Sequence, residues 1–547
     1  SDINPVAVFL LYCTTVYPMQ YGEQLCEDVK KWSEWIQQEA EQGLSKIYPP
    51  KEDGDSPALY YWTNAITCTN PFCQGEIPLI RETWLSKRKN AELAFKLIPC
   101  QGKVKVEIKK KGEIDFDPNE GTMYKVATCL HCGTKIDGNQ IKQMFKEGRF
   151  RERLLLVVNK NKSGDIYIRT QTEKDLYFIE QAKLYLEQKR EHIKKEYGID
   201  PVPTEELQQG ECYLRQRLYG RKKHEDLYSV RNLSVIITYL EQALRLKKML
   251  TTTLPIDYAK AILSYIAIGI NRIANRNSKL CGLKMGAFDG NRSCIYPYFR
   301  MSWIHVEVNP LHNKHSWNRI FYPVLKILKS LTKLKTPTIV KKVSATSLPY
   351  PDQYFDAFYV DPPYYDYVPY TDLSSYFYVW LKRSIGDLYP ELFSDNIPDN
   401  SKDIVLYKDR YGIYYKERYR TLLYQALSEC SRTLKNDGIG CVAFACRSVE
   451  AWVEMINAIK QADMNITASW PSVTEVSERF NAFNSVMITA SLALICRKNQ
   501  KQRNNIDISE IKKKLKELMP KKIELYWNSR ISGCDLFFSI LGDVAII

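Results

Sequence analysis

The sequence lacks several features that define common classes of protein. No apolar run approaches the roughly 18 residues that a membrane-spanning helix needs, and no Walker-type phosphate loop is present. Only six histidines occur, and no Ser/His/Asp grouping stands out among them. These absences argue against a membrane protein, a P-loop nucleotide hydrolase and a serine hydrolase.

Size, cysteine content and charge narrow the class further. At about 150 residues per domain, 547 residues predict three or four domains. The fifteen cysteines are odd in number and spread along the chain, which favours thiols that are free or metal-bound in a reducing compartment, and we expect a cytoplasmic protein. The net charge is +15, and residues 81–160 hold 18 basic against 10 acidic residues. Such an excess suits nucleic acid, but it is also common on a solvated face.

The residue pattern changes along the chain. Short alternating segments with glycine turns predict a β-rich region over 59–160, and a 3.6-residue periodicity predicts helices over 173–275. Residues 280–315 are irregular and aromatic. Strand-like segments alternate with helical ones over 336–498, among them PTIVKKVSA, YFDAFYVDPP, GIGCVAFACR and ASLALICRK. This alternation predicts a βαβ-type, mostly parallel sheet, in which ligands bind at the carboxyl ends of the strands.

Two close pairs of cysteines indicate a metal site. They lie in CTNPFCQG and CLHCG, which resemble the two knuckles of a zinc ribbon. Four thiolates suit tetrahedral zinc, and with four protein ligands the site would be closed and structural. Unrelated buried cysteines are the alternative, and His131 or Cys100 could replace a ligand. The predicted ligands are Cys68, Cys73, Cys129 and Cys132.

The segment YVDPPYYDYVPY follows a predicted strand and has the chemistry of a clamp for an amino group. An amino group on an aromatic base is a poor nucleophile, and two acceptors beside its hydrogens would draw it toward tetrahedral geometry. Asp361 offers a carboxylate and Pro362 a carbonyl, because consecutive prolines hold the chain extended. Tyr364 offers a flat face for a base flipped out of a duplex. An unusual turn without a ligand is the alternative.

A set of motifs, in order, resembles the zinc-ribbon-containing adenine-specific DNA methylases, which carry a DPPY motif. The resemblance covers nearly the whole chain. Its segments are DINPVAV, CTNPFCQGEIPLIRETWLSK, CLHCGTKI, NRIANRNSKLC, EVNPL, SATSLPYPDQYFDAFYVDPPYYDYVPYTDLSSYFYVWLKR, WPSVTE and ISGCDLFFSILG.

The resemblance implies transfer of a methyl group from S-adenosylmethionine to the exocyclic amino group (N6) of adenine in DNA. By match, the catalytic loop is Asp361, Pro362, Pro363 and Tyr364. The implied cofactor contacts are Asp2, which matches the acid that binds the ribose hydroxyls, with Asn4, Pro5, Ala345, Thr346, Ser347 and Leu348. Candidates for contact with the nucleic acid are Tyr365, Lys382, Arg383 and Arg300.

The implied fold is α/β: a Rossmann-like S-adenosylmethionine methyltransferase sheet with an inserted zinc ribbon and a helical insertion. The expected division is 1–50 as part of the methyltransferase domain, 58–165 as the ribbon-like insert, 166–280 as the helical insertion, 281–335 as a connecting segment suited to target recognition, 336–500 as the catalytic part and 501–547 as a C-terminal extension.

The match has one departure and leaves alternatives. The family's Phe-x-Gly-x-Gly loop after its first strand is absent from these residues, and both ends of the chain are apolar, so we expect a fragment of a longer protein. The same turn serves cytosine N4 methylation and RNA methylation, and a DNA-binding zinc-ribbon subunit without catalysis is a further alternative. Expected partners are DNA and other subunits of a host-defence or modification system, without a membrane.

Overall fold

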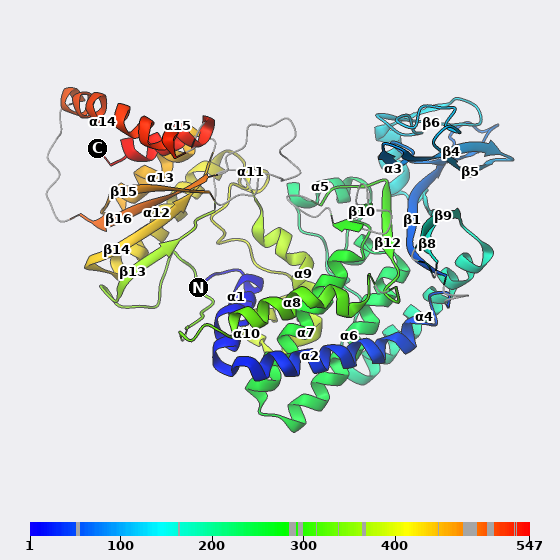
Figure 1. The fold of residues 1–547 in the computed structure, drawn as a ribbon, viewed down its shortest axis with the longest axis horizontal. Coiled ribbons are helices and arrows are strands. Elements are labelled where there is room, and N and C mark those ends of the chain that lie inside the picture. The colour runs from blue at the N-terminus through cyan, green and yellow to red at the C-terminus, as the bar shows by residue number, and fades with distance from the viewer. Residues whose placement is uncertain are drawn as a thin grey trace. The chain divides into compact units, whose positions relative to one another are not determined.

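The chain forms two compact units (Figure 1). The smaller unit comprises Ser1–Val8, Lys341–Thr371 and Asp399–Ile547, and the larger unit comprises Phe9–Val340 and Asp372–Pro398. The computed structural model describes residues 1–50, 55–161, 163, 165–283, 291–293, 299–312, 314–336, 338–363, 368–446, 448–473, 490–499, 508–529, 531 and 533–546.

Helices make up much of the larger unit. They are α2 (Tyr17–Leu44), α3 (Gly138–Lys146), α4 (Glu173–Tyr197), α5 (Glu211–Leu218), α6 (Val230–Thr253), α7 (Ile256–Arg276), α8 (Trp317–Leu331) and α10 (Pro390–Phe393), with most of α9 (Tyr370–Ile385) and the last three residues of α1 (Pro5–Leu11). Helix α6 is buried on nearly every side of its first four turns, as expected of a helix in the centre of a bundle. Helices α7 and α8 approach closely at Gly269, where a Cβ atom would meet the Trp317 ring at 2.5 Å.

The strands of the larger unit form several sheets. They are β1 (Ser56–Thr67), β2 (Glu76–Pro78), β3 (Trp84–Arg88), β4 (Ala91–Cys100), β5 (Lys103–Lys110), β6 (Val126–Thr128), β7 (Lys135–Asp137), β8 (Arg151–Lys160), β9 (Ile166–Thr170), β10 (Cys281–Leu283), β11 (Asn291–Ser293) and β12 (Ile304–Val308). The main sheet has the order β12-β1-β8-β9, and β2 also pairs with β1. Strands β3, β4 and β5 form a separate antiparallel sheet. Apolar residues of both sheets share one core, in which Phe95 of β4 and Leu156 of β8 are fully buried.

A buried ion pair joins the helices to the main sheet. Arg231 in the first turn of α6 donates to Glu307 of β12, and both side chains are excluded from solvent. The rings of Tyr48 and Tyr60 lie 4.7 and 3.9 Å from the guanidinium carbon, and the Tyr48 hydroxyl donates to Glu307 at 3.2 Å. A buried charge needs such partners because its desolvation is costly.

The smaller unit is a four-stranded sheet covered by helices. Its strands are β13 (Phe355–Val360), β14 (Leu434–Phe444), β15 (Met464–Val473) and β16 (Ala490–Lys498), in the order β13-β14-β16-β15. Its helices are α11 (Lys408–Tyr411), α12 (Tyr415–Thr433), α13 (Val449–Gln461), α14 (Ile508–Asn528) and α15 (Gly533–Val544). Residues of the strands and of α12, α13 and α15 share one core, in which Trp452 stacks on Phe538 at 5.9 Å.

The predicted α/β class is confirmed in its coarse form, because helices and several sheets are both present. The expectation of a mostly parallel sheet over 336–498 is wrong for the described strands. Only β13 and β14 are parallel, whereas β14–β16 and β15–β16 are antiparallel. The segment PTIVKKVSA forms no named strand and makes one parallel bridge, from Lys342 to Asp2. The region 280–315, expected to be irregular, contains the buried strand β12.

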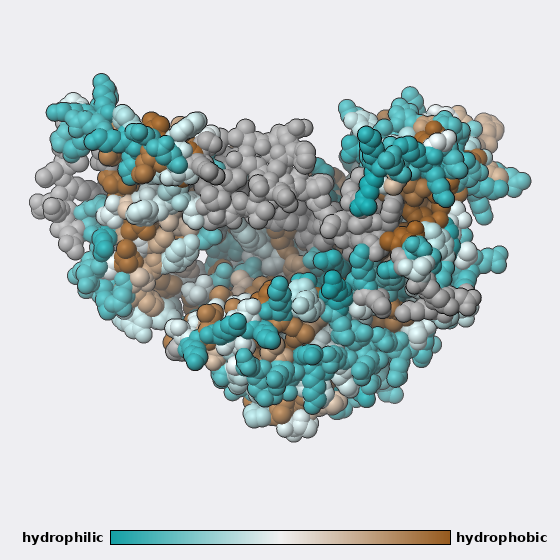
Figure 2. Space-filling view, viewed as in Figure 1, coloured by the Kyte–Doolittle hydropathy of each residue, from teal (hydrophilic) through white to brown (hydrophobic). Residues whose placement is uncertain are grey.

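Among the described residues, no helix is both long and apolar enough to cross a bilayer. Hydrophilic residues predominate on the face drawn in Figure 2, with hydrophobic ones scattered between them.

The buried pair gives a test of the fold. We expect Glu307→Ala to lower the free energy of unfolding by about 3–5 kcal/mol, because it leaves the Arg231 guanidinium buried without its counter-ion. The double substitution Arg231→Met with Glu307→Leu removes both charges, and it should cost clearly less. Urea denaturation followed by circular dichroism measures both, and equal losses for the two variants would contradict this account.

Candidate metal centre and candidate active-site loops

The four predicted metal ligands lie together in the larger unit. The Sγ atoms of Cys68, Cys73, Cys129 and Cys132 are all within 4.8 Å of one another, and the pairs Cys68–Cys132 and Cys73–Cys129 are 3.7 Å apart. Tetrahedral bonds of about 2.3 Å to one ion place thiolates about 3.8 Å apart, whereas a disulfide needs about 2.05 Å. Four cysteines thus cluster closely enough to hold a metal ion, and among the described residues they are the only group of three or more ligands that does so.

Backbone hydrogen bonds shape both knuckles. In the first knuckle, the amides of Cys73 and Gln74 donate to the carbonyl of Asn70 at 3.0 and 3.1 Å. In the second knuckle, the Gly133 amide donates to Cys129 O at 2.9 Å, and Gly133 has φ of +75°, a conformation that favours glycine.

One of the four cysteines, Cys132, is favoured as a thiolate, whereas the pKa values of the other three thiols are raised. The Thr134 hydroxyl lies 3.1 Å from Cys132 Sγ, and its hydrogen bond lowers the pKa of the Cys132 thiol to about 6. Gly75 lets the knuckles approach, because a Cβ atom there would meet the His131 ring at 2.4 Å. Neither His131 nor Cys100, the alternative ligands, belongs to the cluster.

The acid–Pro–Pro turn lies where the parallel strands of the smaller unit end. Asp361 is the first residue after β13, and its side chain is exposed. The buried Tyr419 of α12 donates its hydroxyl proton to Pro363 O at 3.1 Å, which anchors the turn to the core. Tyr364 and Tyr365 lie outside the described residues. The glycine-containing segment 438–441 belongs to β14, where Gly440 makes room for Phe358 of the neighbouring strand.

The segment DINP packs beside the helix that follows this turn. Asp2 Oδ1 accepts a hydrogen bond from the Asn4 amide at 2.8 Å, and Asn4 Oδ1 accepts one from Val6 N at 2.9 Å, which caps α1 ahead of Pro5. The Asn4 amide nitrogen Nδ2 donates to Thr371 Oγ1, in the first turn of α9, at 3.4 Å. Two segments 367 residues apart in sequence therefore meet within the smaller unit.

The loop with Ala345, Thr346, Ser347 and Leu348 is held by α12. The Leu348 amide donates to Glu429 Oε2 at 2.7 Å, and Arg432 donates to the carbonyls of Leu348 and Tyr350 at 3.1 and 2.9 Å. Arg432 also grips Glu429 through two bonds of 2.7 and 2.8 Å, and these bonds lower the pKa of the Glu429 carboxyl. Neither Glu429 nor Arg432 belongs to a recognisable motif, so the sequence did not predict their role.

Three of the residues predicted to contact nucleic acid lie among the described residues, and they differ in their surroundings. Arg383 is buried, forms an ion pair with Glu205 at 2.8 Å and donates to three backbone carbonyls, so its contacts leave the predicted role without support. Lys382 donates to Asp395 O at 2.7 Å, and Arg300 is exposed.

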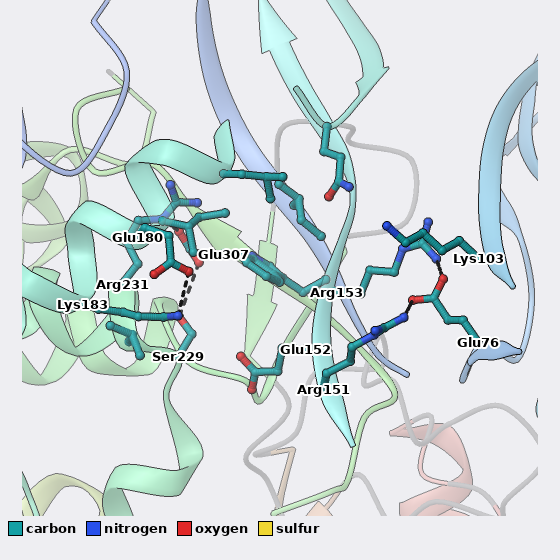
Figure 3. Close-up of a pocket in the computed structure, with 16 residues that line it drawn as sticks. Glu76, Lys103, Arg151, Glu152, Arg153, Glu180, Lys183, Ser229, Arg231 and Glu307 are labelled. Atoms are coloured by element: carbon teal, nitrogen blue, oxygen red, sulfur yellow. Dashed lines mark hydrogen bonds and ion pairs between the residues drawn. The ribbon is translucent and has the colours of Figure 1, made fainter. Parts of the chain in front are cut away.

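A cavity of about 500 Å³ in the larger unit was not predicted from the sequence (Figure 3). Acidic and basic side chains from β8, α4, α6 and β12 line it. Its four carboxylates all have a cationic partner: Glu76 with Arg151 and Arg153, Glu152 with Lys279, Glu180 with Lys183, and Glu307 with Arg231. The cavity wall is therefore an ion-pair network.

No family model, no curated protein and no solved structure matches this chain.

The contacts of Arg432 give a test of the loop. We expect Arg432→Met to speed amide hydrogen exchange over residues 344–352 by about tenfold or more, because the charge-assisted hydrogen bonds from Arg432 to this loop are lost. Lys435→Met removes only the exposed pair with Asp356 and serves as the control. Equal exchange in the two variants would show that Arg432 does not hold the loop.

Proposed function

We propose that the chain is the catalytic part of an S-adenosylmethionine-dependent DNA methyltransferase that modifies the exocyclic amino group of adenine, and that its four-cysteine centre binds structural zinc. One contact carries the enzymatic part: the Asn4–Thr371 hydrogen bond, which joins the DINP segment to the helix after the Asp-Pro-Pro turn. This contact supports a single site in which the implied cofactor residues and the implied catalytic turn are neighbours.

The residues near DINP fit the cofactor in their chemistry. Asp2 uses Oδ1 to accept the Asn4 amide, while Oδ2 makes no hydrogen bond with the described residues and can accept one from a ribose hydroxyl. The loop 345–348, held by Glu429 and Arg432, would lie beside the adenine ring. When bound, S-adenosylmethionine supplies an electrophilic methyl group.

Asp361 and Pro362 would orient the target amino group. An exposed carboxylate at the end of a strand accepts a hydrogen bond from one N–H, and the Pro362 carbonyl accepts one from the other. These bonds concentrate the nitrogen lone pair on the face opposite the acceptors. Once the nitrogen is alkylated it becomes acidic, so no strong base is required, and positioning and electrostatics supply most of the rate.

The catalytic role of Asp361 is tested by substitution. Asp361→Ala should lower methyl transfer to duplex DNA by about a hundredfold or more, because one preorganised acceptor is lost. DNA binding should not change. Asp356→Ala, on the strand β13 that precedes Asp361 and in an exposed ion pair, is the control and should stay within about twofold.

Radioactive methyl transfer from labelled S-adenosylmethionine measures this activity, and digestion to nucleosides separates N6-methyladenine from N4-methylcytosine. Activity retained by Asp361→Ala would refute the assigned role. If the unsubstituted protein and both variants bind DNA but transfer no methyl group, the proposed enzyme is replaced by the alternative of a non-catalytic DNA-binding subunit.

The zinc assignment has its own test. Purified protein should contain about one zinc ion per chain, and Cys129→Ser should lose most of it together with stability, because a small β-rich region depends on its metal. Cys100→Ser should keep the zinc, since Cys100 lies outside the cluster. Elemental analysis measures the content. A well-folded protein without metal would exclude the zinc ribbon.

A further inference from the structure

The sheet formed by β3, β4 and β5 has a strong excess of positive charge. Residues 84–111 contain nine basic and two acidic residues. Nothing in the main sheet or the metal centre requires this charge. It therefore calls for an explanation in terms of what the sheet binds.

Alternation along β5 turns three lysines to one face. Val104 is buried, and Val106 and Ile108 pack against the core shared with the main sheet, so these residues point inward. Lys103, Lys105 and Lys109 stand at the alternate positions and therefore point away from that core. Along a strand such positions are about 7 Å apart, so the lysines form a row.

Little negative charge opposes this row. Glu107 stands between Lys105 and Lys109 and lies 3.2 Å from Lys109 Nζ. Lys103 and Lys105 are exposed and form no ion pair with the described residues. At one end of the row, Arg151 and Arg153 surround the single carboxylate of Glu76, as Figure 3 shows, which extends the cationic surface.

An exposed aromatic ring lies near the same end. Phe72, at the tip of the first knuckle, is 100% exposed, and its amide donates to Asn70 Oδ1 at 3.0 Å. The knuckle joins the lysine row through its backbone: the Cys68 amide donates to Gly75 O, and the Glu76 amide donates to Gly102 O, next to Lys103, each at 2.8 Å. This ring is the most exposed of the large apolar side chains in the described part of the chain, so it is available to a partner that binds the lysine row.

We propose that Lys103, Lys105, Lys109 and Phe72 form a contact surface for duplex DNA, with the lysines on the phosphates and the ring against the sugar–base edge of the groove. This inference rests on the proposed function, to which it adds the site that holds the substrate. A row of three lysines, of which Lys103 and Lys105 form no ion pair with the described residues, suits a repeating anion. An aromatic side chain suits the apolar faces of nucleotides. An acidic protein would supply the charge but no regular repeat.

The lysine row is tested by its effect on the salt dependence of binding. A labelled duplex of about 30 base pairs is titrated with protein at salt concentrations between about 50 and 200 mM, with fluorescence anisotropy as the readout. The combined Lys103→Ser, Lys105→Ser and Lys109→Ser variant should bind at least about tenfold more weakly at the lower salt, and the slope of log K against log salt should fall by up to about 2.7. The matched control, Lys195→Ser with Lys326→Ser and Lys329→Ser, removes the same charge from exposed positions of α4 and α8 and should leave both quantities unchanged.

The aromatic contribution is separated from the ionic one by a fourth variant. Phe72→Ala keeps all four cysteines, so its zinc content should equal that of the unsubstituted protein. Its affinity should fall about tenfold, while the salt slope stays the same because no charge is lost. A changed slope or an unchanged affinity would remove Phe72 from the surface.

The outcomes keep this inference apart from the proposed chemistry. If the three-lysine variant binds the duplex with unchanged affinity and slope, or if the unsubstituted protein binds an RNA duplex more tightly, the inference is overturned even where methyl transfer is observed. If no methyl transfer occurs but the three-lysine variant loses binding, the surface is supported and the proposed reaction fails.

Discussion

The desolvated pair of Arg231 and Glu307 is the constraint on which the larger unit depends. A carboxylate and a guanidinium that water cannot reach must remain paired, because separating them would leave two buried charges without a partner. Arg231 belongs to α6 and Glu307 to β12, so the pair joins the helices to the sheet. Tyr48 and Tyr60 enclose the cation and add β1 to the same junction. Strand β1 then continues along the main sheet as a buried strand and ends directly before Cys68. The junction thus fixes the strand from which the metal centre projects.

The sequence predicted those features that depend only on the spacing of neighbouring residues. The 3.6-residue periodicity over 173–275 corresponds to α4, α5, α6 and α7, and YFDAFYV contains β13. The spacing of the cysteines predicted the cluster correctly, because ligation by two knuckles requires two short pairs whatever separates them.

What could not be predicted depends on partners distant in sequence. The direction of β16 is set by its pairing with β14 and β15, and a strand of alternating or continuous apolar residues carries no information on the direction of its neighbour. Strand β12 is short and contains two buried polar side chains, His305 and Glu307. Its sequence therefore does not look like a buried strand, and only the pairing with β1 identifies it as one. The grip of Arg432 on the 344–352 segment and the burial of Arg383 arise likewise from long-range packing.

The separation of the two knuckles has a consequence for the order in which the protein assembles. Cys73 and Cys129 lie 56 residues apart, and strands β3, β4 and β5 are formed from the chain between them. During synthesis the first knuckle is made well before its partner, so it has only half of a coordination sphere to offer. A metal ion held by all four thiolates closes a long loop. The entropic cost of closing that loop is lower once the intervening sheet has already formed. Binding of the ion would then be a late event, which follows the formation of the sheet and does not nucleate it.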